Sequence, residues 1–154
     1  QGGSGGINGL LLAREYDYDN GTDCLTIRLP SGRKLYYISP GIGQNAWGRP
    51  SISYMGMDQK TKRWKRIETY GGKLTENLTQ AIGRDCLEFA LDNLKASGYK
   101  VVFHIHDEVV VEHGTENPEA DLQRIRTIMS QPAPWAKGLP LNAEGWVGQF
   151  FTKD

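Results

Sequence analysis

Alternating apolar and polar residues in the first half of the chain predict an antiparallel β meander. An apolar run at residues 10–13 comes first, and residues 24–29 and 34–38 then alternate as strands do. Turns rich in Asp, Asn, Gly and Pro precede these two strands, at residues 19–23 and 30–33. Residues 51–57 and 64–70 predict a further hairpin around the polar loop 58–63. The glycines and prolines of residues 39–50 indicate an irregular loop.

The longest periodic segment predicts an amphipathic helix that starts near Leu74 or Thr75 and ends at Gly98, a residue type common just after a helix. Gly83, in its middle, lowers helix stability by about 1 kcal/mol relative to alanine. Close packing or the approach of a ligand would explain this glycine. The apolar residues recur at spacings of three and four: Leu74, Leu78, Ala81, Ile82, Cys86, Phe89, Ala90 and Leu94.

Residues 100–112 predict a second hairpin, in which two apolar strands flank an ionisable turn. Tight hairpins favour Asn-Gly or another glycine pair, because the preferred turns need positive φ. Here the turn contains His106, Asp107 and Glu108. A sequence that breaks a local rule between two well-formed strands is a candidate functional site.

A second helix is predicted after Asn117, with Pro118 at its first position and Leu122, Ile125 and Ile128 in its apolar stripe. Residues 139–151 indicate a last extended segment. Together these patterns predict an α+β fold, an antiparallel sheet with helices packed on one face.

The chain length of 154 residues suits one domain with a hydrophobic core, which we assign to residues 7–154. Residues 1–6 (QGGSGG) are interpreted as a linker or a cloning remnant. Eighteen basic residues balance eighteen acidic ones, so net charge neither supports nor excludes nucleic acid. No run approaches the roughly 20 apolar residues of a membrane span, and no secretory signal is visible. Cys24 and Cys86 belong to no CxxC pattern; the sequence leaves a disulfide between them open, and two buried reduced thiols are the expected state.

The acidic pair Asp107 and Glu108 has three explanations. It can be an ordinary polar hairpin tip. It can also contribute oxygen ligands for Mg²⁺ or Mn²⁺, although two-metal phosphoryl transfer needs at least one further carboxylate. A zinc site that uses His104 and His106 is the weakest alternative, because His113 is the one other histidine and the cysteines lie elsewhere in the sequence. His104 is better explained as a core or interface residue.

The turn is accompanied by other short motifs in a fixed order. They are residues 29–33 (LPSGR), 48–49 (GR), 52–56 (ISYMG), 69–85 (TYGGKLTENLTQAIGRD), 105–109 (IHDEV), 135–141 (WAKGLPL) and the final Lys153 and Asp154. In this order they resemble the phage and prophage branch of the family A DNA polymerases, the group related to bacterial DNA polymerase I. Residues 105–109 resemble motif C of that family, and the resemblance extends from about Leu25 to the C-terminus. It implies that the chain is the C-terminal part of the polymerase palm.

The resemblance also implies roles for individual residues. Asp107 matches the aspartate that binds the catalytic Mg²⁺ ions, which Mn²⁺ can replace in vitro, and Glu108 matches the acid beside it, which has a supporting role. His106 matches a histidine near the primer terminus. Asn77 and Gln80 match helix residues that face the primer–template, Gln80 toward its minor groove. Lys73 and Arg84 are expected to contact phosphates.

Other parts of a family A polymerase have no counterpart in the sequence. The motif A aspartate and the fingers helix are missing, and Asp17 and Tyr18 are a poor substitute because they open a glycine turn with no fingers between them and Asp107. We therefore expect the isolated chain not to polymerise. The implied partners are primer–template DNA, a deoxynucleotide and the rest of the polymerase, in the cytoplasm of a bacterial or phage-infected cell, with no membrane.

A second hypothesis is a nucleic-acid-binding module without catalysis. Trp64 is interleaved with basic residues in the hairpin 60–66, and this combination suits nucleic acid, although a solvated turn is the ordinary interpretation. The basic residues are Lys60, Lys62, Arg63, Lys65 and Arg66.

Overall fold

The computed structural model describes residues 4–7, 9–45 and 47–151. The chain divides into two compact units, unit 1 (Gln1–Ile82) and unit 2 (Gly83–Asp154), and each is described by itself. One helix, α1 (Gly71–Ala96), is continuous across the boundary. The predicted α+β class is confirmed, since the described residues form an antiparallel sheet, a separate hairpin and two α-helices.

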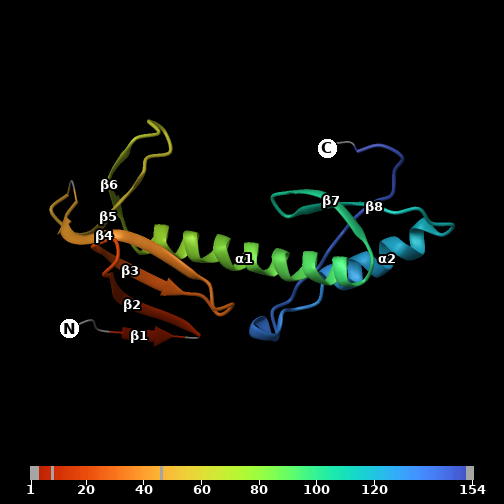
Figure 1. Cartoon of the computed structure of the whole chain (residues 1–154), viewed down its shortest axis with the longest axis horizontal. Helices are drawn as coiled ribbons and strands as arrows, with labels where there is room; N and C mark the ends of the chain where they lie inside the picture. The colour runs from red at the N-terminus through yellow and green to blue at the C-terminus, as the bar shows by residue number, and fades with distance from the viewer. Residues whose placement is uncertain (1–3, 8, 46, 152–154) are drawn as a thin grey trace. The chain divides into compact units, whose positions relative to one another are not determined.

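Unit 1 is a six-stranded antiparallel meander in which each strand pairs with the next along the chain (Figure 1). This confirms the predicted meander and its 51–70 hairpin. The strands are β1 (Ser4–Ile7), β2 (Leu10–Asp17), β3 (Thr22–Arg28), β4 (Lys34–Gln44), β5 (Pro50–Met57) and β6 (Trp64–Thr69).

Two segments of unit 1 pair more extensively than the sequence predicts. Residues 39–50 were predicted to be an irregular loop, and the prediction is wrong for residues 39–44, which belong to β4, and is confirmed for residues 45 and 47–49. A register shift between Ile38 and Gly41 accommodates Pro40, which lacks an N–H, and pairing with β5 then resumes. In the predicted linker (residues 1–6), residues 4–6 belong to β1 and pair with β2 through their backbone groups, and residues 1–3 lie outside the described residues.

The core of unit 1 lies on the two central strands and the first part of α1. Leu29 and Tyr37 are almost fully buried, and Ala81 supplies the helix side. The turn at residues 30–33 connects the sheet to the helix, because the Arg33 guanidinium donates a 2.9 Å hydrogen bond to the Ala81 carbonyl. Gly32 has a φ of 93° in this turn, which explains the glycine of the LPSGR motif.

Unit 2 contains the rest of α1, the hairpin of β7 (Lys100–Ile105) and β8 (Glu108–Glu112), helix α2 (Pro118–Met129) and a short 3₁₀ helix (Pro134–Ala136). The predicted end of α1 is confirmed: Gly98 has a φ of 86°, and the Tyr99 N–H bonds to the Leu94 carbonyl. The predicted start of α2 is also confirmed, because the Asn117 side chain accepts a hydrogen bond from the Ala120 N–H. No strand forms in residues 139–151.

The core of unit 2 combines apolar residues with a buried carboxylate. Leu94, Ala90 and Tyr99 are buried, and Leu94 has no exposed surface. Asp121 of α2 is 8% exposed and accepts a hydrogen bond from the Tyr99 hydroxyl at 3.2 Å. Its other neighbours are His113 and Arg124. This network joins the end of α1 to α2.

Candidate metal centre at the β7–β8 turn

The predicted hairpin is confirmed, and its turn is shorter than the sequence suggests. Ile105 pairs with Glu108, so the two central residues are His106 and Asp107, and Glu108 is the first residue of β8. His106 has a φ of 53°, a left-handed conformation in a position where tight hairpins favour glycine. Histidine tolerates this conformation better than β-branched residues do.

The acids at this turn are exposed. His106, Asp107 and Glu108 are all exposed, and in the described part of the chain neither carboxylate has a hydrogen-bond or ion-pair partner. The acid at the other end of the hairpin behaves differently, because Glu112 pairs with Lys100 at 2.5 Å across the strands. The hairpin therefore presents its free carboxylate oxygens at the tip.

These carboxylates suit a hard divalent cation such as Mg²⁺, but two ligands alone do not complete a metal site. Oxygen ligands are what Mg²⁺ and Mn²⁺ prefer. Among the described residues, no group of three or more His, Cys, Asp or Glu side chains is placed to hold a metal ion. His104 is exposed on β7, so of the two expected positions, core or interface, the core position is wrong.

Three of the predicted DNA-contacting residues lie on the first part of α1, in unit 1. Lys73 forms an ion pair with Glu76 at 2.9 Å, and the Gln80 amide donates to the same carboxylate at 3.4 Å. Asn77 is half-buried and donates a 3.3 Å hydrogen bond to the Tyr37 hydroxyl. The polar face of α1 is thus partly ordered by contacts within the helix and by one bond to a residue 40 positions earlier in the chain.

The second half of α1 belongs to unit 2 with the acidic turn. Arg84 is exposed. Its neighbour Gly83 is exposed too, and a Cβ atom built on it meets nothing within 4 Å among the described residues. Close packing therefore does not explain this glycine.

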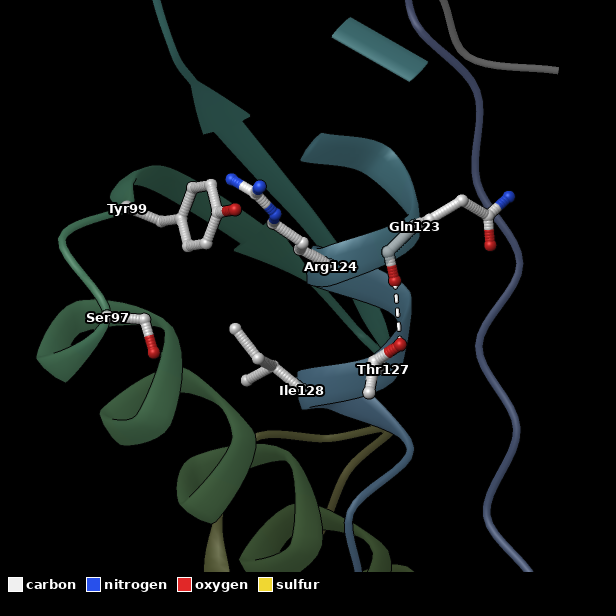
Figure 2. A pocket seen from close by; sticks show the side chains of 6 residues that line it. All are labelled: Ser97, Tyr99, Gln123, Arg124, Thr127 and Ile128. Carbon is white, nitrogen blue, oxygen red and sulfur yellow. Dashed lines mark hydrogen bonds between the residues drawn. The ribbon is translucent and has the colours of Figure 1, made fainter. Parts of the chain in front are cut away.

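An open cavity of about 490 Å³ lies in unit 2, between the end of α1 and α2 (Figure 2). Figure 2 shows the Tyr99 ring and the Arg124 guanidinium turned toward one another, and a hydrogen bond from the Thr127 hydroxyl to the Gln123 carbonyl at 2.8 Å. No residue of the acidic turn lines it. The lining residues are Ser97, Tyr99, Gln123, Arg124, Thr127 and Ile128.

Asp121 has a structural role that is not predicted above. The pKa of the Asp121 carboxyl is lowered, mainly because Thr115 donates a hydrogen bond to it. Burial acts in the opposite direction, and Tyr99, His113 and Arg124 lower the pKa further. Burial and the hydrogen bond to Asp121 raise the pKa of Tyr99. A signal existed, because Asp121 shares a helical face with Ile125 and Ile128 and so interrupts the apolar stripe of α2.

Both cysteines are free thiols, as predicted. Burial raises the pKa of Cys24 and of Cys86, which favours the neutral and less reactive form. In the described part of the chain, no helix is long and apolar enough to cross a membrane.

The chain is similar to a polymerase of a bacterial virus. Over 138 residues it is 42% identical to a protein named DNA polymerase from Bacillus phage SP02. The match covers 89% of this chain and 20% of the relative, so the chain spans about a fifth of the length of the curated protein it matches. No protein-family model matches the chain. No solved structure matches it either.

Proposed function

We propose that this chain is the part of a family A DNA polymerase palm that carries motif C. In the proposed parent enzyme, the palm supports transfer of a deoxynucleotide to a primer 3′ end. The observation that carries the proposal is the β7–β8 turn, where two carboxylates that have no partner among the described residues follow a residue held at positive φ. Similarity to a phage DNA polymerase over 89% of the chain supports it.

In this proposal, Asp107 is the metal ligand and Glu108 assists it. Mg²⁺ would polarise the reacting oxygens and stabilise the charge that develops on the phosphoryl group. The backbone strain at His106 fits such a role, since strained residues concentrate at active sites. His106 is exposed at the first turn position, where its ring is available to a primer terminus.

The helix α1 is proposed to contact the primer–template. Gln80 is exposed and Asn77 is held by Tyr37, so their amides offer donors for the minor-groove acceptors that all base pairs share. Lys73 and Arg84 are proposed phosphate contacts. To contact a phosphate, the Lys73 ammonium would have to leave the Glu76 carboxylate or bind both groups at once.

The isolated chain is proposed to be inactive. Its described residues place no third acidic or histidine ligand with Asp107 and Glu108, whereas two-metal phosphoryl transfer needs at least one further carboxylate beside such a pair. We expect no primer extension by the purified 154-residue chain in Mg²⁺ or Mn²⁺. Extension by this chain that is lost in Asp107→Ala would contradict this part of the proposal.

Two experiments test the acidic turn. In the first, this chain replaces the matching segment of the Bacillus phage SP02 polymerase, and primer extension is measured for the chimera and for Asp107→Asn, Glu108→Gln and Glu116→Gln. Loss of a catalytic metal ligand is expected to lower kcat by a factor of about 10³ or more, since metal ions contribute several kcal/mol of transition-state stabilisation. Glu116→Gln removes an exposed carboxylate elsewhere in unit 2 and should leave kcat unchanged.

The second experiment does not depend on the chimera. Mn²⁺ titrated into the purified chain should broaden the amide NMR signals of Asp107 and Glu108 first, and Asp107→Asn should abolish this preference. Equal broadening at Glu116 in the unmodified chain would show that the turn is an ordinary polar tip.

A further inference from the structure

The hairpin of β5 and β6 carries a concentration of positive charge that the acidic turn does not use. Residues 57–66 contain five basic residues and one acid, a net charge of +4 in a chain whose total is zero. The remaining residues therefore carry a net charge of −4. Glu68 is the nearest acid along β6. In Figure 1 the tip of this hairpin extends away from the neighbouring strands of unit 1.

The tip is held in a defined conformation by its single acid. Asp58 accepts hydrogen bonds from the Lys60 N–H at 3.1 Å and from the Thr61 N–H at 2.7 Å, and its other oxygen pairs with Lys65 at 2.7 Å. The ion pair with Lys65 and the hydrogen bonds from the N–H and the hydroxyl of Thr61 keep the pKa of Asp58 well below its usual value. The turn is therefore ordered without help from the other basic residues.

The remaining cations are free to meet a partner. Lys60, Lys62 and Arg63 are exposed and have no side-chain partner within the described ranges of the chain. Lys62 has a φ of 54°, a conformation in which glycine would be less strained. A charged side chain thus occupies a position where the backbone conformation favours glycine.

An aromatic surface lies beside these cations. Trp64 is 55% exposed and pairs across the strands with Met57, which is 53% exposed. Arg66 lies on the same face as Trp64, because side chains two apart in a strand share a face. Its guanidinium is fixed by hydrogen bonds to the Ser39 carbonyl and the Ser53 hydroxyl, at 3.2 and 3.1 Å.

We infer that this hairpin is a second nucleic-acid contact that binds single-stranded DNA, with Trp64 as a stacking platform and Lys60, Lys62 and Arg63 as phosphate contacts. An exposed ring gives a platform for an unstacked base, and flanking cations follow the backbone. Duplex DNA offers the cations its phosphates but offers Trp64 no free base. The inference stands independently of the acidic turn.

The test measures binding of a fluorescein-labelled 16-nucleotide oligo(dT) to the purified chain by anisotropy, between 50 and 300 mM KCl. The triple variant Lys60→Gln, Lys62→Asn, Arg63→Gln should reduce the slope of log Kd against log salt by about 2, since each single-strand phosphate contact contributes about 0.7. Asparagine is chosen at position 62 because it tolerates positive φ. Trp64→Leu should weaken binding to oligo(dT) by about five-fold or more and leave binding to a duplex of equal length unchanged.

The matched control removes three positive charges from exposed positions elsewhere, as Arg28→Gln, Lys95→Gln, Lys137→Gln. It should keep the slope and the affinity of the unmodified chain.

The inference is overturned if the control loses as much binding as the hairpin variant, if the unmodified chain does not bind oligo(dT) at 50 mM KCl, or if Trp64→Leu binds it normally. The hairpin and the proposed metal centre are tested separately, because failure of the metal centre would show in primer extension and Mn²⁺ broadening and not in the binding of oligo(dT).

Discussion

At the scale of single residues, His106 has the least favourable backbone conformation in the β7–β8 hairpin, with a φ of 53°. His106→Gly should relieve about 1–2 kcal/mol of left-handed strain and lose about 0.5–1 kcal/mol through unfolded-state entropy. The expected result is a free energy of unfolding that is unchanged or raised by up to about 1 kcal/mol. Urea unfolding of the purified chain measures it.

The same substitution two residues earlier provides the control. His104 lies within strand β7 and has no positive φ, so His104→Gly should destabilise the chain by about 0.5–1 kcal/mol. Equal destabilisation by both variants would mean that the strain at His106 is absent. In the chimeric polymerase, His106→Gly should still slow primer extension, because the proposed contact between the ring and the primer terminus is lost.

Asp121 makes the stability of the chain depend on acid pH. Its pKa is lowered in the folded state, so its contribution is fully present above the unfolded pKa of about 3.9 and is lost as the pH falls through the folded value. Asp121→Asn should lower the melting temperature at pH 7, and the difference from the unmodified chain should shrink toward pH 2. Asp92→Asn, at an exposed position of α1, is the control for the removal of one carboxylate. A constant difference at all pH values would exclude this role of the charge.

At the scale of elements, Asn117 fixes the start of α2 through its 3.1 Å hydrogen bond with the Ala120 N–H. Asn117→Ala should destabilise the chain by about 1 kcal/mol, whereas Asn117→Asp, which keeps an acceptor, should be nearly neutral. Urea unfolding measures both variants, and amide exchange at Ala120 reports the cap directly. Similar losses in both variants would show that the cap bond is unimportant.

The elements that the sequence predicts well are those with local signals. The cap at Asn117, the end of α1 at Gly98 and the turn at Gly32 follow from backbone rules that act within a few residues. Residues 39–44 are different, because their pairing depends on a bulge and on β5, which comes later in the chain. Glycine content alone could not predict that partner.

The candidate site was also predictable only in part. Asp107 and Glu108 were candidates from the sequence because they stand in a tight turn where glycine is expected. The hydrogen bond of Asn77 to Tyr37 and the burial of Asp121 depend on residues far apart in the chain, and local patterns do not encode them.

At the scale of the whole molecule, each unit has its own buried leucine, Leu29 in unit 1 and Leu94 in unit 2. Substitution of either by alanine should cost about 2–5 kcal/mol in its unit. Leu29→Ala should lower amide-exchange protection mainly in β3 and β4, and Leu94→Ala mainly in α2. Uniform loss of protection in both variants would show that the chain unfolds as one cooperative unit.

Gly83 offers a way to separate selection for folding from selection for function. Its φ is not positive and a Cβ atom there meets nothing within 4 Å of the described residues, so Gly83→Ala should stabilise α1 by about 1 kcal/mol. In a library of variants screened for thermal resistance of the purified chain, alanine should therefore be enriched at this position. In the same library screened for replication by the chimeric polymerase, glycine should persist if DNA approaches this part of the helix. Opposite enrichment at one position would mark Gly83 as a residue retained for a partner at the expense of stability.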